Sequence, residues 1–332
     1  MFKNLEINEE LKTITKKKLE KLIKHPEKFN DDIWVSKKSI DISGNKKISS
    51  LPNNLVITAG FDMSNCKNMT KMPIKMVVFG IFNMSECDKL TSLPEEMLLN
   101  GGIVYVANCE TLTNLPNCLY VDGWMEITSC NSITSFPETL EVNGTLRFNS
   151  CLGLKSLPEN LQIAGDIEFN SCLGLTSLPE NLYVAGSLSL QKCTGLKSIP
   201  AGLKVGKSLK LSGCTGLTTL PENMHIKGNL DLTGCIGLTK LPENLYVGGM
   251  LRLNDCTNLT SLPESLKVGE ILTLDGCSNL TSLPKSLEEK VFLNKTDSNQ
   301  LPFLTGNQEL ANRITQNNIG TMDIFRLTLL NS

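Results

Sequence analysis

The sequence predicts a β-rich solenoid, in which about twelve short coils stack on one another through parallel strands. Cysteine recurs every 21 residues, with a single interval of 22, at positions 66, 87, 109, 130, 151, 172, 193, 214, 235, 256 and 277. Proline keeps the same spacing from position 52 to position 284. Both series slip at the same place, where Gly101 and Gly102 add one residue. Two residue types that share one register, including its slip, indicate repeats that stack into a continuous core.

One representative unit shows the physical role of each position. Leu188 and Leu190 alternate with polar residues, and this period of two predicts a short strand with its leucines inward. Cys193 is small and apolar, which suits a buried turn at the end of the strand. Pro179 fixes φ and lacks an amide donor, so the return segment is expected to be extended. Gly195 recurs in other units, and we expect a positive φ there.

The strand and its turn resemble a known signature. Residues 209–217 read Leu-Lys-Leu-Ser-Gly-Cys-Thr-Gly-Leu, similar to the leucine-rich-repeat pattern L-x-L-x-x-N/C-x-x-L. The first unit has Asn45 where later units have cysteine. The short unit and the recurring Leu-Pro resemble repeats of secreted bacterial effectors and of some phage proteins. The phrase Ser-Gly-Cys followed by Leu-Pro also resembles plant intracellular immune receptors. The resemblance covers residues 40–290 and implies a leucine-rich-repeat solenoid.

That resemblance sets the expected domain organisation. Parallel strands should line a concave face, and extended segments should line the convex face. We expect an N-terminal helical cap at residues 1–39, a solenoid of about twelve units at 40–296, and a C-terminal cap at 297–332.

The expected caps rest on local patterns near the two ends. Residues 8–24 have the apolar spacing of an amphipathic helix, which Pro26 would end. Residues 33–35 are expected to form an edge strand, and residues 291–293 the last strand. Closing the exposed core is sufficient reason for both caps, and a targeting role is the alternative.

The composition excludes several classes of function. The formal net charge of −2 shows none of the basic excess that is typical of nucleic-acid binders. No stretch of eighteen apolar residues predicts a membrane-spanning helix, so no membrane insertion is expected. A charged stretch follows Met1, which predicts no secretory leader.

The cysteines are expected to be structural. A metal site needs clustered ligands, whereas these cysteines are 21 residues apart and the sequence has two histidines. Disulfides between neighbouring coils are the other alternative, and they require an oxidising compartment. We predict eleven buried, reduced thiols, with Cys118 outside the column, and no cofactor. A reducing, cytoplasmic location follows, and delivery into a host cell is the alternative location.

The variable outward positions of the strands are the candidate binding site. Tyr105 and Trp124 are large aromatics at positions where other units carry small polar residues, and Ile81 and Ile103 are their expected neighbours. Exposed aromatics beside apolar residues are typical of binding hot spots. The alternative is a packing adjustment around the Gly101–Gly102 insertion. The predicted partner-binding residues are Tyr105, Trp124, Ile103, Glu126, Arg147, Glu168, Lys210 and Arg252.

The charged members of this set have an alternative role. Each predicted strand has one central outward residue, and together these residues form the central row. In order along the chain they are Asp41, Asp62, Asn83, Tyr105, Glu126, Arg147, Glu168, Ser189, Lys210, Asp231, Arg252 and Thr273. Charge signs alternate along parts of this row, so neighbouring strands can pair laterally instead of contacting a partner.

Three functions follow from these observations. The first is a scaffold, monomeric alone, that binds a protein partner through the concave face, with a host-directed effector as one form of it. The second is a self-associating or phage-particle-bound assembly component. The third is an enzyme, which columns of like residues and two histidines disfavour.

Overall fold

The computed structural model describes residues 12–15, 17, 33–116, 118–137, 139–159 and 161–293. The chain divides into two compact units, unit 1 at Met1–Phe169 and unit 2 at Asn170–Ser332. Each unit is built from stacked coils whose strands pair in parallel with the equivalent strands 21 or 22 residues away. The described residues therefore form the predicted leucine-rich-repeat solenoid.

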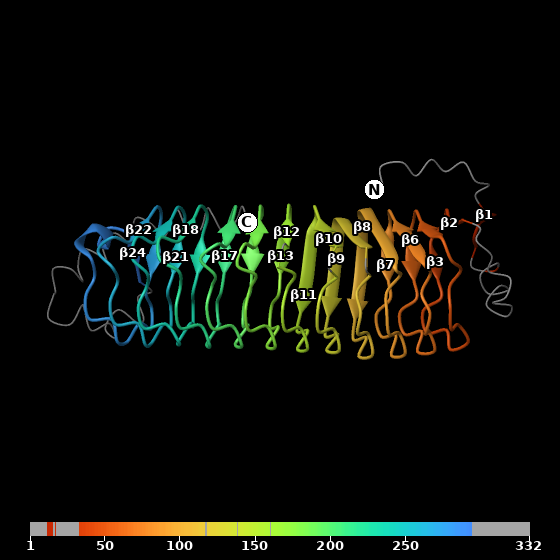
Figure 1. The fold of residues 1–332 in the computed structure, drawn as a ribbon, viewed down its shortest axis with the longest axis horizontal. Helices are drawn as coiled ribbons and strands as arrows, with labels where there is room; N and C mark the ends of the chain where they lie inside the picture. The colour runs from red at the N-terminus through yellow and green to blue at the C-terminus, as the bar shows by residue number, and fades with distance from the viewer. Residues whose placement is uncertain are drawn as a thin grey trace. The chain divides into compact units, whose positions relative to one another are not determined.

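Unit 1 contains two parallel ladders, which can be followed in Figure 1 from the red end of the chain. The primary ladder precedes the Asn/Cys column and contains β3 (Ile40–Asp41), β5 (Phe61–Asp62), β7 (Ile81–Asn83), β11 (Thr145–Asn149) and β13 (Asp166–Glu168). The return ladder contains β1 (Lys12–Thr13), β2 (Trp34–Ser36), β4 (Leu55–Ile57), β6 (Lys75–Val78), β10 (Thr139–Val142) and β12 (Gln162–Ile163). Two long strands, β8 (Glu96–Ala107) and β9 (Cys118–Thr128), run through both ladders.

Unit 2 repeats this arrangement with shorter strands. Its primary ladder contains β15 (Leu188–Ser189), β17 (Leu209–Lys210), β19 (Leu230–Asp231), β21 (Leu251–Arg252), β23 (Leu272–Thr273) and β24 (Val291–Phe292). Its return ladder contains β14 (Tyr183–Val184), β16 (Lys204–Val205), β18 (His225–Ile226), β20 (Tyr246–Val247) and β22 (Lys267–Val268). A 3₁₀ helix, η2 (Lys285–Leu287), precedes the last strand.

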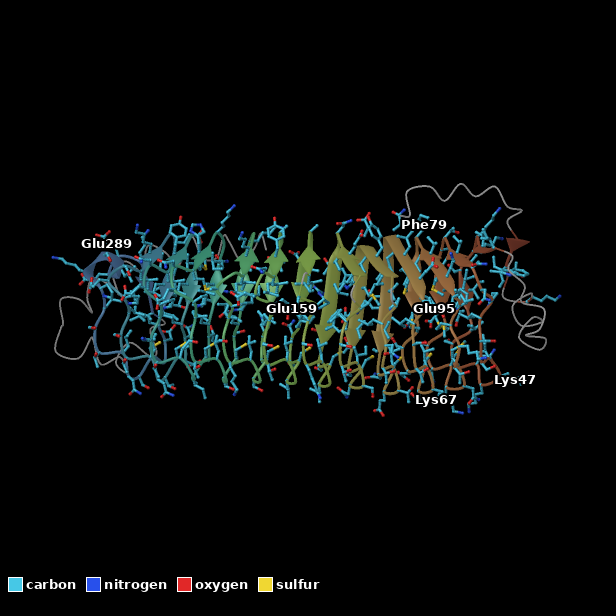
Figure 2. The ribbon with its side chains drawn as sticks, in the orientation of Figure 1. Lys47, Lys67, Phe79, Glu95, Glu159 and Glu289 are labelled. Carbon is cyan, nitrogen blue, oxygen red and sulfur yellow. The ribbon has the colours of Figure 1, made fainter. Side chains whose placement is uncertain are left out.

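Each coil bends sharply where the return strand leads into the primary strand. Met76 and Val78 are buried before the bend, Phe82 is buried after it, and Phe79 and Ile81 are exposed. Figure 2 shows Phe79 at one end of its coil and Lys67 at the opposite end. Gly80 stands at the bend because a Cβ there would overlap the backbone of Ala59 in the preceding coil. The strict alternation of buried and exposed residues therefore continues through the corner.

Each coil contributes one layer of buried apolar side chains to the core, and the residue types in this layer differ between the units. In unit 1 the inward positions of the primary ladder include Phe61 and Phe82, whose ring centroids are 5.7 Å apart, and Phe148 and Phe169, at 5.8 Å. In unit 2 the inward positions from Leu188 to Leu274 are leucines, and they are fully buried. Leucine and phenylalanine fill the same layer because each coil buries its apolar side chains against its neighbours.

The eleven column cysteines are buried free thiols, as the sequence predicts. Nine of these thiols donate a hydrogen bond to the carbonyl oxygen of a core residue in the preceding coil. Cys66 reaches the oxygen of Ile42 at 3.2 Å, and Cys214 reaches the oxygen of Leu190 at 3.0 Å. Cysteine thus fills a narrow core layer and also satisfies a buried backbone acceptor.

Burial raises the pKa of most of these thiols, because the thiolate loses its hydration. The pKa rises to about 11 for Cys151 and Cys214, and to about 12 for Cys87, Cys256 and Cys277. It also rises for Cys66, Cys193 and Cys235. A thiolate is the nucleophilic form of cysteine, so these thiols stay protonated and unreactive at neutral pH. The pKa of Cys109 is instead lowered, because its sulfur shares a hydrogen bond with the thiol of Cys130.

The prediction of a positive φ at Gly195 is wrong. Left-handed residues instead occupy the position directly before each column cysteine, with φ between 55° and 76° from Asn65 to Gly276. Gly195 instead allows a close approach of two coils, since a Cβ there would overlap the carbonyl oxygen of Leu173 in the preceding coil. Its equivalents Gly153 and Gly216 meet the same obstacle.

The N-terminal cap differs from the expected helix where the structure describes it. Lys12–Thr13 forms strand β1, which pairs with Trp34–Val35 of β2, and the amide of Ile14 donates to the carbonyl of Val35 at 2.9 Å. Strand β2 also pairs with β4, so the expected edge strand has neighbours on both sides. The physical reason is that the open ladder edge offers unpaired backbone groups, which β1 satisfies.

At the other end the expected last strand is confirmed. Val291–Phe292 forms β24, which pairs with β23 of the preceding coil. The predicted C-terminal cap at 297–332 lies outside the described residues, as do most residues of the predicted helix at 8–24.

Two glycines of one turn, Gly234 and Gly237, differ in why glycine fits there: the first has a positive φ, and the second lies close to the backbone of the preceding coil. Gly234 has φ +69°, and the nearest atoms to an added Cβ are 3.8 Å away, whereas a Cβ on Gly237 would lie 2.5 Å from the oxygen of Leu217. Asparagine tolerates the left-handed region, so Gly234→Asn should cost under about 1 kcal/mol. Gly237→Ala should cost about 1–3 kcal/mol or more through overpacking. Urea unfolding measures both, and an equal loss would contradict the close-approach explanation.

The raised thiol pKa values predict how stability falls at alkaline pH. An unfolded thiol has a pKa of about 8.5, so rising pH removes protons from the unfolded state first. The stabilisation is complete below that pH and is lost as pH rises toward the folded values of about 11–12. Each buried thiol should contribute about 1.4 kcal/mol per pH unit to this loss.

A single substitution checks this slope. Cys214→Ala should reduce the steepness of the loss between roughly pH 9 and 10.5 by about 1.4 kcal/mol per pH unit, measured by urea unfolding at several pH values. Thr215→Ala, at an exposed neighbouring position, is the control. An unchanged slope in Cys214→Ala would mean that this thiol titrates normally in the folded protein.

Candidate binding surface

The outward side of the primary ladder in unit 1, here called the primary face, brings the predicted aromatic residues together. Ile81, Ile103 and Trp124 are aligned on successive strands and form one apolar row. Tyr105 lies two residues beyond Ile103 on β8 and is aligned with Glu126 on β9. Trp124 and Tyr105 are thus diagonal neighbours on adjacent strands, as the sequence predicts.

The inserted residue falls beside this group. Strand β8 pairs with β9 in two registers, with an irregularity between Asn100 and Ile103. Gly101 has φ +68°, and a Cβ on Gly102 would lie 2.6 Å from the carbonyl oxygen of Val78. The two glycines therefore absorb the extra residue as a bulge at the corner, and the strand after it keeps its inward and outward sides.

The apolar side chains of this region are open to solvent. Ile81 is 51% exposed, Phe79 at the corner is 46% exposed, and Tyr105 is 38% exposed. Ile103 and Trp124 are half-buried beside them. Phe79 is a residue that the sequence analysis missed, although the alternation of buried and exposed residues through Gly80 would have placed it outward.

Arg147 covers the indole ring of Trp124. Its guanidinium carbon lies 4.1 Å from the ring centroid, and its Nη2 atom lies 3.1 Å from Oε1 of Glu168. Both side chains of the ion pair are about a quarter exposed, at 29% and 26%. The lateral pairing that the sequence left as an alternative therefore applies to Arg147 and Glu168, and such a pair contributes about 0.2–1 kcal/mol.

The stack leaves two hydrogen-bond donors without acceptors. Nε1 of Trp124 and Nε of Arg147 are both buried and have no partner within the described part of the chain. An unsatisfied buried N–H group costs free energy, so the stack is less stable than its contacts alone suggest.

Glu126 remains an acidic site beside Tyr105. Its Oε1 atom accepts a hydrogen bond from the hydroxyl of Thr128 at 3.3 Å. Arg147 on the next strand forms its ion pair with Glu168 rather than with Glu126. Of the three alternating charges, Arg147 and Glu168 thus form an ion pair, and Glu126 forms none with Arg147.

The predicted residues of unit 2 form a different surface. Lys210 is exposed, and Nη1 of Arg252 lies 4.0 Å from Oδ2 of Asp231, at the limit of an ion pair. Ser189 and Thr273, which were expected to face outward, are each only 6% exposed. The hydroxyl of Ser189 donates a hydrogen bond to Oδ1 of Asn170 at 2.7 Å.

Sequence reasoning also missed an aromatic group on the return ladder of unit 2. Tyr183 is 43% exposed and Tyr246 is 38% exposed. The rings of His225 and Tyr246 stack with centroids 4.4 Å apart and an angle of 8° between their planes. Their spacing of 21 residues in the sequence was the available signal.

No helix among the described residues has the length and apolar character needed to cross a bilayer. Within the same residues, no three His, Cys, Asp or Glu side chains come together in a group that could hold a metal ion.

The Arg147 stack can be tested by fluorescence. The sequence has two tryptophans, so Trp34→Phe leaves Trp124 as the single reporter. In this background Arg147→Ala should increase quenching of Trp124 by acrylamide and lower the free energy of unfolding by about 1 kcal/mol, through loss of the stack and the ion pair. Lys210→Ala is the control, since Lys210 is exposed. Unchanged quenching in Arg147→Ala would show that the guanidinium does not cover the ring.

Comparison with known proteins gives a likeness to solved structures alone. No family model and no curated protein matches the sequence. The crystal structure of a leucine-rich repeat protein from Bacteroides ovatus matches with 18% identity over 86% of this chain and 92% of its own, with a TM-score of 0.36. The structure itself, with its 21-residue coils, parallel ladders and buried cysteine column, has the fold of a leucine-rich-repeat solenoid.

Proposed function

We propose that this protein is a scaffold that binds another protein through the primary face of unit 1. Leucine-rich-repeat folds are typical of protein-binding scaffolds, and function lies in the outward residues that each fold carries. One observation supports this location above all. Ile81 and Tyr105 are exposed beside half-buried Ile103 and Trp124, on a ladder whose other outward positions are mostly polar.

The energetic argument concerns the exposed rings. Aromatic side chains bury a large area when a partner covers them, and they lose little conformational entropy. Tyr105 and Trp124 are centred on the primary face, with Glu126, Arg147 and Glu168 as their polar surroundings. This arrangement of an apolar centre and a polar rim is typical of protein interfaces. Lys210 and Arg252 are proposed as separate contact residues in unit 2.

The cellular setting is the second part of the proposal. Buried, reduced thiols suit a reducing compartment such as the cytoplasm. A host-directed effector role rests on the resemblance of the short Leu-Pro repeats to secreted bacterial effectors. An enzymatic role is not proposed, since the ladders present rows of like residues rather than a converging set of unlike ones.

The chain offers a matched control for the proposed site. Tyr105 and Tyr246 are both 38% exposed, but they lie on different ladders of different units. With a partner isolated by affinity purification, Tyr105→Ala and Trp124→Ala should each weaken binding by about 30-fold, the loss expected for a hot-spot residue near 2 kcal/mol. Tyr246→Ala should leave the affinity unchanged.

The opposite pattern would place the site elsewhere. Loss of binding in Tyr246→Ala with full binding in Trp124→Ala would reject the primary face of unit 1. Sedimentation of the purified protein provides a separate check, because ordered self-assembly without a partner would favour the assembly component over the scaffold.

A further inference from the structure

We propose that the primary face of unit 1 recognises an extended protein segment in which two cationic side chains flank an apolar one. This inference rests on the proposed function and specifies the chemistry of its partner. It is carried by the charges of the central row, by the position of the apolar row and by the geometry of the Arg147 stack.

The central row of unit 1 is acidic. From β3 to β13 it reads Asp41, Asp62, Asn83, Tyr105, Glu126, Arg147 and Glu168, each aligned with the next. These residues carry four carboxylates and one guanidinium, and the guanidinium is already paired with Glu168 at 3.1 Å. A partner with a basic segment would complement this row, whereas an acidic one would be repelled.

Two of the carboxylates have unused acceptor capacity. Among the described residues, no cationic side chain forms an ion pair with Asp62 or Glu126. Asp62 accepts from the amide of Ser64 at 2.8 Å and from Asn83 at 3.4 Å. Glu126 accepts from Thr128 at 3.3 Å. A carboxylate can accept about four hydrogen bonds, so both can also bind a cationic donor.

The lysines at the far edge of unit 1 do not neutralise this row. Figure 2 shows Lys47 and Lys67 at the end of the coil opposite to Phe79, next to which the apolar row begins. Lys67 is engaged there by Asp88, with Nζ and Oδ2 3.3 Å apart. Acidic and apolar groups thus lie together, away from these cations.

The distance between Asp62 and Glu126 matches an extended partner segment. Asp62 on β5 and Glu126 on β9 are three coils apart, which is about 14 Å at the usual distance between strands. An extended chain rises about 3.4 Å per residue, so residues i and i+4 span the same distance and point to the same side. Residue i+2 would then lie between them, over Tyr105 and the apolar row.

Arg147 already shows how this surface holds a guanidinium. It lies on the Trp124 ring at 4.1 Å and bonds Glu168 at 3.1 Å. Tyr105 and Glu126 are aligned on adjacent strands and offer the same combination of an aromatic ring and a carboxylate. Tyr105 is 38% exposed, so its ring is open to an arginine of a partner.

The test uses a phage-displayed library of random 12-residue peptides, selected on the full chain. Recovered peptides should carry more Arg and Lys than Asp and Glu, with basic residues on both sides of an apolar one. Two recovered peptides, labelled with fluorescein, should bind at least about 10-fold more weakly to Asp62→Asn/Glu126→Gln, since buried or half-buried charge pairs contribute this much. Their affinity should also fall as salt rises from about 50 to 500 mM.

The substitutions are chosen to keep the fold. Asparagine and glutamine retain the oxygen that accepts from Ser64 and from Thr128. Glu95→Gln/Glu141→Gln removes the same charge from exposed positions of unit 1 outside the primary face, and it should leave binding unchanged. Thermal unfolding of each variant checks that the loss is not a loss of structure.

The outcomes separate this inference from the proposed function. Peptides that lose binding on Trp124→Ala but not on Asp62→Asn/Glu126→Gln would support the surface and overturn its cationic preference. Peptides that are acidic or neutral, or no recovered peptides at all, would also overturn it. Recovered basic peptides that bind Trp124→Ala and Tyr105→Ala as tightly as the wild type would reject the primary face itself.

Discussion

The close approach of successive coils is the constraint on which the whole structure depends. Parallel pairing brings neighbouring backbones to about 4.8 Å, and at several positions this leaves no room for a Cβ atom. At Gly153 and Gly237, for example, a Cβ would overlap a carbonyl oxygen of the preceding coil. In other coils the equivalent residue is larger and donates a hydrogen bond to that carbonyl, as Ser132 does to Glu110 and Asn258 to Ile236. The same spacing lets nine of the column thiols reach a backbone oxygen of the coil before them, as Cys66 and Cys214 do.

The insertion at Gly101–Gly102 shows how a coil can be one residue longer without a change in the spacing between coils. An extra residue in an inward segment would displace the core, but at the corner two glycines accommodate it as a bulge. The strands beside it are also the longest ones, β8 and β9, which run through both ladders. Long paired strands hold the outward side chains of Ile103, Tyr105 and Trp124 in a fixed relation, which favours binding without a large loss of entropy.

The repeat made the fold predictable from the sequence, whereas the interactions of individual side chains could not be predicted. The cysteine and proline periods and the alternation around Leu188 predicted the coils, the facing of the strands and the buried thiols. The positive φ was placed at Gly195 because the sequence does not distinguish a glycine that adopts a positive φ from one that allows two backbones to approach closely. The strand at Lys12–Thr13 was missed because its partner, the open edge of the return ladder, is a tertiary feature. The positions of Tyr105 and Trp124 followed from alternation, but the choice of Glu168 rather than Glu126 by Arg147 depends on side-chain geometry.

A solenoid separates the residues that hold it together from those that are free to recognise a partner. The inward positions contact only neighbouring coils, so their chemistry repeats and any change there alters stability. The outward positions contribute little to the fold, and they vary from Asp62 to Tyr105 to Arg147 along one row. Ile81 and Tyr105 stay partly in water after folding, so they contribute less to stability than the buried residues do. The proposed partner would bury them and would neutralise Asp62 and Glu126 beside them.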